Sequence, residues 1–305
     1  MDKERIRTHG PLIAIFILIQ IIGLFVLSIY SPVPTQVNVN NETKNISQYD
    51  LPFGFNPPSD VSYKYTLIQL VMSIIFAVFI FLLLMKLQVV RVLKFWFFLV
   101  SFIALSVSFA AFLKPFAYGT SIALVLGLIV GFLKTFRPTV IFHNLGELFI
   151  YPGIAAVLVP LFNIPSMIIL FVIISLYDMY AVWHSGFMQR MAKYQIRKVK
   201  VFSGLLIPQF ITKSGFVNPA NKKYTKGKGQ KIAVAMLGGG DIVFPMLLAG
   251  VLLHAGFFVI AISSLIGSTV GLTLLILNSQ KGKFYPAMPF ITLGAFAGLI
   301  IGWLL

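Results

Sequence analysis

Nine long apolar segments divide this 305-residue chain, and each is close to the length that crosses a lipid bilayer. A transmembrane helix needs about 20 mostly apolar residues, and a helix satisfies all of its own backbone polar groups within lipid. Charged residues make up only 10% of the chain, whereas soluble domains carry about 25%. The sequence therefore predicts an all-α integral membrane protein with nine transmembrane helices, located in the cell membrane as a multi-pass protein. The predicted spans are Pro11–Tyr30, Leu67–Met85, Phe95–Leu113, Phe116–Leu133, Leu145–Phe162, Ser166–Trp183, Ile232–Leu253, Gly256–Leu277 and Pro289–Leu305.

The basic residues give an orientation. When the nine spans alternate in direction, all but three of the 24 lysines and arginines fall on the side of the amino terminus. The exceptions are Lys44, Lys64 and Lys114. Because basic loops stay in the cytoplasm, we expect a cytoplasmic amino terminus and an outside carboxyl terminus. The net charge of +16 is thus explained by topology in the lipid bilayer, and it does not indicate a nucleic-acid partner.

The connections suggest three parts of the chain: residues 1–185 with six spans, a basic cytoplasmic loop at 186–231, and residues 232–305 with three spans. The outside segment Ser31–Ser62 is polar and rich in proline and asparagine, so we expect a loop there.

The basic loop is itself uneven in composition. Basic and apolar residues alternate in Met188–Val201, which fits a membrane-surface amphipathic helix and a solvated loop about equally well. Val201–Phe216 is more apolar and favours strand-like structure, and Asn218–Gln230 has the composition of a flexible linker.

Only three acids lie in or near the apolar runs: Glu147, Asp178 and Asp241. The other five are in the tail or the first outside loop: Asp2, Glu4, Glu42, Asp50 and Asp60. Acids at membrane depth are costly, face the protein interior or a watery cavity, and mark functional sites. Glu147 begins the fifth span, where we expect it to face the cytoplasmic headgroups in a structural role.

Asp178 and Asp241 are placed to meet. Asp178 lies six residues before His184, roughly 9 Å inside the cytoplasmic end of the sixth span at helical rise. Asp241 follows Lys231 by ten residues, nominally about 15 Å into the seventh span. Two neighbouring carboxylates share one proton. One can then activate water as a general base while the other protonates a carbonyl oxygen.

Other chemistry has less support in the sequence. The chain has no cysteine, and its four histidines (His9, His143, His184 and His254) show no metal-ligand spacing. We therefore expect no metal and no cofactor. From residue type alone, a proton-coupled transporter remains at least as good an interpretation of two intramembrane aspartates as a catalytic pair.

Three short motifs decide between these interpretations. They are Tyr177-Asp178, Gly238-Gly239-Gly240-Asp241 and Pro286-Ala287-Met288. In this order they resemble the YD, GxGD and PAL motifs of the presenilin and signal peptide peptidase family of intramembrane aspartyl proteases, with Met288 in place of leucine. The resemblance covers the whole nine-helix topology. Within the family, the chain is most similar to a microbial or archaeal presenilin homologue. It implies an Asp178/Asp241 catalytic dyad that cleaves transmembrane-helix substrates.

The resemblance also implies roles for the residues around the dyad, and each has a physical basis. Tyr177, Gly238, Gly240 and the Pro286-Ala287-Met288 segment are expected to bind substrate. Glycines allow close backbone approach and let the seventh helix unwind beside Asp241. Pro286 and Pro289 bracket an extended segment that could pair with an unwound substrate.

Two alternative functions also fit part of the sequence. A prepilin-type peptidase also uses a GxGD aspartate, but it lacks the PAL-like element. A proton-coupled transporter often has inverted repeats with matching broken helices, and the first half of this chain shows no counterpart of Gly238–Gly240. The oligomeric state is left open between a monomer and a homo-oligomer.

Overall fold

The computed structural model describes residues 3–39, 42–57, 63–137, 139–185, 194, 203–208, 234–279 and 285–305. Within these ranges, each predicted span contains one long helix. The helices are α1 (Lys3–Ile29), α2 (Tyr63–Lys86), α3 (Val90–Leu113), α4 (Gly119–Phe136), α5 (Val140–Leu158), α6 (Ile164–Tyr180), α8 (Gly239–His254), α9 (Phe258–Asn278) and α10 (Met288–Leu304). Six of them form spans long and apolar enough to cross a membrane, α5 and α6 together with the helical turns that follow them, while α8, α10 and the apolar part of α2 are shorter.

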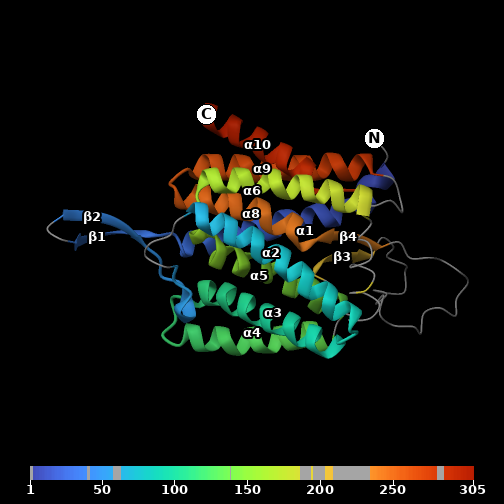
Figure 1. Ribbon diagram of the computed structural model, residues 1–305, viewed down its shortest axis with the longest axis horizontal. Helices are drawn as coiled ribbons and strands as arrows, with labels where there is room; N and C mark the ends of the chain where they lie inside the picture. Colours follow the sequence, from blue (N-terminus) through green and yellow to red (C-terminus); the bar gives the residue numbers. More distant parts are fainter. Residues whose placement is uncertain are drawn as a thin grey trace, which may run out of the picture.

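The helices form a bundle with the two ends of the chain at opposite ends of it (Figure 1). A chain that runs through the bundle an odd number of times must begin and finish at opposite ends. The strands β3 (Gly204–Pro208) and β4 (Val234–Gly238) lie at the end where the chain begins, and the hairpin of β1 and β2 extends from the opposite end (Figure 1). The cytoplasmic location of the amino terminus stays a prediction.

The segment Ser31–Ser62 was expected to be a loop, and instead it contains two strands. Strands β1 (Val33–Val39) and β2 (Glu42–Gln48) form an antiparallel hairpin in which Val33 pairs with Gln48. The first strand alternates valine or threonine with other residues, and such β-branched residues favour strands. The loop was predicted because proline and asparagine are common in this segment, and that prediction did not consider the period-two pattern.

A second hairpin changes the start of the seventh span. The strand expected within 201–216 is confirmed at β3, which pairs antiparallel with β4 so that Gly204 faces Gly238. The prediction of one continuous helix over Ile232–Leu253 is therefore wrong for Val234–Gly238. A short apolar run has the same composition in a strand as in a helix. The amphipathic segment 188–201, apart from helical Tyr194, and the linker 218–230 lie outside the described residues.

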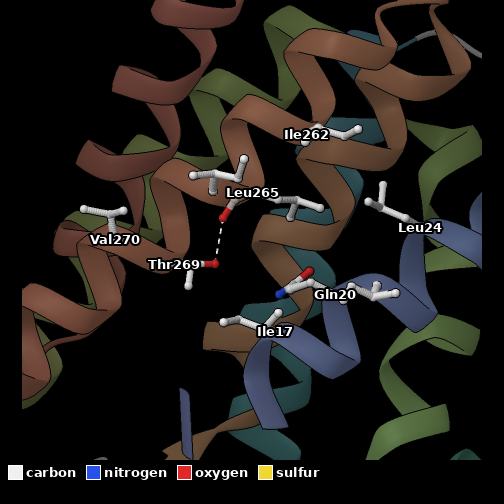
Figure 2. A pocket seen from close by; sticks show the side chains of 9 residues that line it. Ile17, Gln20, Leu24, Ile262, Leu265, Thr269 and Val270 are labelled. Carbon is white, nitrogen blue, oxygen red and sulfur yellow. Dashed lines mark hydrogen bonds between the residues drawn. The ribbon is translucent and has the colours of Figure 1, made fainter. Parts of the chain in front are cut away.

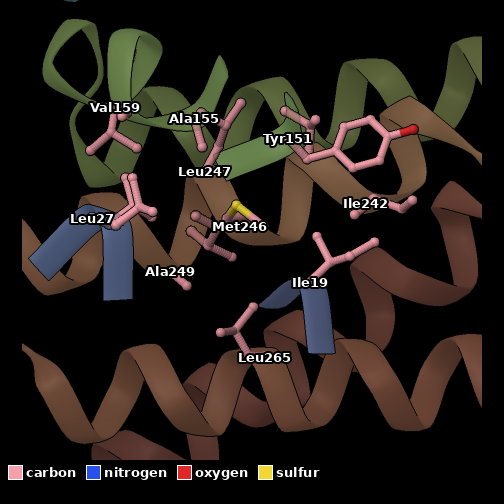
Figure 3. Close-up of a cluster of buried hydrophobic side chains, with 14 of the residues drawn as sticks. Ile19, Leu27, Tyr151, Ala155, Val159, Ile242, Met246, Leu247, Ala249 and Leu265 are labelled. Atoms are coloured by element: carbon pink, nitrogen blue, oxygen red, sulfur yellow. The ribbon is translucent and has the colours of Figure 1, made fainter. Parts of the chain in front are cut away.

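Helix α8 occupies the centre of the core. It contacts α1, α5, α6, α9 and α10, and nearly every residue from Asp241 to Leu252 is buried. Figure 3 shows its apolar side chains packed with those of α1, α5 and α9, among them Ile19, Tyr151, Ile242, Met246 and Leu265. The element that carries Asp241 is therefore surrounded by protein on most sides.

The last two helices pack through glycines. A Cβ atom added at Gly267 or Gly271 of α9 would meet the backbone of α10, and one added at Gly294 or Gly298 of α10 would meet the backbone of α9. Small residues let membrane helices approach this closely, and dispersion forces then hold them together. The pair α9–α10 is thus joined backbone to backbone.

Candidate active site

Asp178 lies in the last turn of α6 and only 4% of it is exposed. Helix α6 starts from a capping box in which Asn163 and Ser166 bond to each other's backbone N–H groups. It ends in a π-helical turn at Ala181–Ser185. The apolar sequence between these boundaries carries Asp178 into the bundle near the end where β3 and β4 lie.

The Pro286-Ala287-Met288 segment lies directly against Asp178. The backbone N–H of Met288 donates to Oδ2 of Asp178 at 3.0 Å, and the backbone N–H of Ala287 lies near the same carboxylate. All three residues of the segment are buried. The segment is therefore hydrogen-bonded to one of the two buried aspartates.

A second bond joins α6 to α10 one turn away. The hydroxyls of Ser175 and Thr292 lie 2.7 Å apart and both side chains are buried. Ser175 precedes Asp178 by about one turn, and Thr292 follows Met288 by about one turn. Together the two bonds fix the height of α6 relative to the start of α10.

Asp241 lies in the first turn of α8, with 8% of the residue exposed. Its carboxylate lies near the backbone N–H of Gly238 and within electrostatic range of Asp178. Beyond it, the ring of Phe244 packs edge-on against Phe171 of α6 with centroids 6.5 Å apart. The fold therefore brings together two acids that are distant in sequence.

The three glycines before Asp241 differ in their surroundings. A Cβ at Gly238 would lie 3.1 Å from Oδ2 of Asp241, whereas one at exposed Gly240 would make an ordinary 3.5 Å contact with Phe244. Gly239 is packed against the ring of Tyr151, where a Cβ would come within 2.9 Å of it. Gly239, which sequence reasoning did not select, thus has the tightest surroundings of the three.

Tyr177 lies beside Asp178 in sequence but on a more open side of α6, with 48% of its area exposed. It is therefore available for contact with another molecule. The structure brings Asp178, Asp241, Gly238 and the Pro286–Met288 segment together, while Tyr177 and Gly240 lie at the exposed margin of this group.

Glu147 does not face the headgroups, and that expectation is wrong. It is fully buried and its Oε1 lies 2.9 Å from Nζ of Lys134. Tyr151, on the same helix, interacts electrostatically with Asp241. Sequence reasoning missed Lys134 and Tyr151, although the four-residue spacing of His143, Glu147 and Tyr151 places them on one helix face.

A groove of about 290 Å³ lies elsewhere, between α1 and α9. It is lined mainly by aliphatic side chains, with Gln20 on one wall and Thr269 on the other (Figure 2). Gln20 Nε2 donates to the carbonyl oxygen of Ile242 at 3.1 Å. The groove therefore lies behind α8, and no residue of the candidate dyad lines it.

Comparison with known families gives the site its context. The model of the signal-peptide peptidase and presenilin aspartyl protease family matches residues 14–305. The chain belongs to this family. Among curated proteins, the sequence finds no significant match.

The family fold also appears in solved structures. One presenilin family intramembrane aspartate protease, solved in space group C222, superposes with a TM-score of 0.56 at 16% identity, covering 95% of each chain. A structure of such a protease in space group P2 gives a TM-score of 0.59 at 17% identity, covering 96% of each chain. At such identity the likeness concerns the fold, and the match confirms the presenilin-like architecture.

Proposed function

We propose that this presenilin-family chain is an intramembrane aspartyl endopeptidase that hydrolyses peptide bonds within the transmembrane segments of other proteins. The observation that supports this proposal is that two acids distant in sequence, Asp178 of α6 and Asp241 of α8, are both largely buried in the bundle and lie within electrostatic range of each other. Two close carboxylates share a proton. The pair then holds a base and an acid at the same time.

The chemistry follows from this shared proton. The ionised carboxylate takes a proton from a water molecule as the oxygen attacks the peptide carbonyl, while the protonated carboxyl donates to the carbonyl oxygen. The hydrogen bond from the Met288 N–H fixes the orientation of the Asp178 carboxylate. Preorganised groups of this kind avoid reorganisation during the reaction.

Substrate recognition requires an extended backbone, because the peptide bonds of an intact helix are shielded. Strand β4 runs directly into Gly239 and Asp241, and within the described residues it pairs with β3 alone. An unwound substrate segment can add to such an edge by backbone hydrogen bonds. We had expected an extended segment between Pro286 and Pro289, but α10 already begins at Met288. We assign Tyr177 and Gly240, both exposed, to substrate contact, and Pro286–Met288 to holding Asp178 beside the substrate.

The membrane placement completes the proposal. The amino terminus and the β3–β4 hairpin are in the cytoplasm, so the dyad lies on the cytoplasmic side of the bilayer midplane. The enzyme acts on single transmembrane helices of other proteins in the cell membrane, as a monomer or a homo-oligomer.

Cleavage of a purified transmembrane reporter in lipid vesicles tests the proposal. Asp178→Ala and Asp241→Ala should each abolish cleavage while leaving the thermal unfolding transition in place. Asp50→Ala is the matched control, because Asp50 forms an exposed ion pair with Lys114 and its loss should leave cleavage intact. Retained cleavage in either dyad variant refutes the mechanism.

The position of the cleaved peptide bond distinguishes the proposed function from the alternative functions. Mass spectrometry should place it inside the membrane-spanning part of the reporter, whereas a prepilin-type peptidase would cut at the cytoplasmic boundary. Proton uptake into vesicles without any cleavage would favour a transporter.

A further inference from the structure

A stripe of buried polar residues runs along one face of α5. His143, Glu147 and Tyr151 are spaced four residues apart, so they lie above one another on the helix. Their exposed fractions are 5%, 0% and 1%. The dyad chemistry uses none of these three residues, yet the stripe ends next to Asp241.

The middle of the stripe holds a buried ion pair. Lys134 of α4 is 4% exposed, and its Nζ lies 2.9 Å from Glu147 Oε1 and donates to Ser101 Oγ at 3.4 Å. Taking both charges out of water costs about as much as their attraction returns, and an apolar pair of similar volume is often as stable. Stability alone therefore gives no reason for this pair.

One end of the stripe binds the hairpin that precedes Asp241. His143 Nε2 lies 2.7 Å from the carbonyl oxygen of Gly204, the first residue of β3. Gly204 in turn faces Gly238 across the two strands. The backbone N–H of Gly239 also donates to the Ser203 carbonyl oxygen at 3.4 Å. Helix α5 thus fixes the strand pair from which α8 emerges.

The other end of the stripe reaches the start of α8. A Cβ at Gly239 would lie 2.9 Å from the Tyr151 ring and 3.0 Å from its hydroxyl oxygen, so the ring packs tightly against that backbone. Figure 3 shows the Tyr151 hydroxyl pointing away from the apolar cluster. The hydroxyl lies near the Glu147 carboxylate, the Ser203 hydroxyl and the carboxylate of Asp241. Within the described residues it forms no hydrogen bond of regular geometry.

We propose that Tyr151, oriented by the Glu147–Lys134 ion pair, is a positioning residue that sets the place of Asp241 relative to Asp178. The proposal rests on the proposed protease function. Tyr151 acts through the backbone at Gly239, two residues before Asp241, and its hydroxyl is directed by Glu147. If Tyr151 were only a core residue, a phenyl ring of the same shape would serve equally well.

Tyr151→Phe tests this, with Tyr30→Phe as the matched control. Tyr30 is also buried, at 3% exposure, but its hydroxyl donates to the Val107 carbonyl oxygen at 2.9 Å, away from the dyad. We expect Tyr151→Phe to lower kcat about tenfold, because small displacements of a catalytic group cost this much or more. KM should stay within about twofold. Tyr30→Phe should leave both constants unchanged for the folded protein.

A second variant tests whether the ion pair acts through Tyr151. Lys134→Met combined with Glu147→Gln removes both charges and leaves no unpaired ion, so the fold survives. Its kcat should fall as in Tyr151→Phe, and adding Tyr151→Phe should cause no further loss, because groups acting in series are not additive. Losses that multiply would overturn the link between the ion pair and Tyr151.

The outcomes separate this inference from the function on which it rests. If Tyr151→Phe cleaves the reporter at the wild-type rate while Asp241→Ala is inactive, the protease function is supported and the positioning role of Tyr151 is refuted. An equal loss of kcat in Tyr30→Phe also overturns the role. A wild-type protein that leaves every transmembrane reporter intact overturns both.

Discussion

The backbone N–H of Met288 donates a hydrogen bond to Oδ2 of Asp178 at 3.0 Å, across 110 positions of sequence. This bond joins α6 to the first residue of α10. It explains why a proline-containing segment remote from both acids belongs to the same site. Because the donor is a backbone group, the identity of the side chain matters only for packing.

Substitution of Met288 should therefore affect stability more than chemistry. Met288→Leu, which restores the residue of the PAL motif, conserves volume and should change the free energy of unfolding by less than about 1.5 kcal/mol. Met288→Ala should destabilise by about 2–5 kcal/mol through the cavity it leaves. Both keep the N–H, so kcat of the folded fraction should change less than about threefold. A tenfold fall in kcat for Met288→Leu would contradict the backbone role.

The glycines beside Asp241 should separate kcat from KM. Gly238→Ala places a Cβ 3.1 Å from the Asp241 carboxylate, so it should displace that group and lower kcat about tenfold. Gly240→Ala meets only an ordinary contact with Phe244 and lies on an exposed surface. It should raise KM by hindering substrate approach, with kcat nearly unchanged. Steady-state cleavage of the reporter measures both constants, and the reverse pattern would contradict the assignment.

The two lysine ion pairs should differ greatly in their contribution to stability. Lys134→Met leaves Glu147 as an unpaired buried anion and should cost about 3–5 kcal/mol of unfolding free energy. Lys114→Met breaks an exposed 3.3 Å pair with Asp50 and should cost at most about 1 kcal/mol. Unfolding in detergent micelles compares the two, and adding Glu147→Gln to Lys134→Met should restore most of the loss.

The hydroxyl pair between α6 and α10 offers a double-mutant cycle. Ser175→Ala leaves the buried Thr292 hydroxyl without its partner, which should cost about 1–3 kcal/mol. Ser175→Ala combined with Thr292→Val removes both polar groups and should be close to wild type in stability. Additive losses in the thermal transitions of the single and double variants would show that the two hydroxyls are not coupled.

Much of this architecture follows from composition alone. Apolar runs of bilayer length predicted all nine long helices of the described residues, because lipid leaves the chain few other options. The same criterion failed at Val234–Gly238, where five apolar residues form a strand. A strand and a helix buried on all sides have similar composition, and the pairing partner Gly204–Pro208 is distant in sequence.

The site was predictable in part. Asp178 and Asp241 are rare acids in apolar surroundings, so the cost of burying a charge singled them out. Tyr151 gave no such signal, because an aromatic residue on an apolar helix is usually core. The burial of Glu147 depends on Lys134 of the neighbouring helix, and only the packing of α4 against α5 reveals that partner. The Met288–Asp178 bond uses a backbone group, which every non-proline residue possesses.

The glycine contact between α9 and α10 has a mechanical consequence for the dyad. Since Gly267 and Gly294 meet backbone to backbone, no deformable layer separates these helices, and the pair must tilt and translate as one stiff unit. Met288 begins the second helix of that unit, so its N–H is held by a support that yields little. Because α6 is bonded to the start of this unit at Asp178 and at Ser175, the Asp178 carboxylate shares the support of the stiff pair.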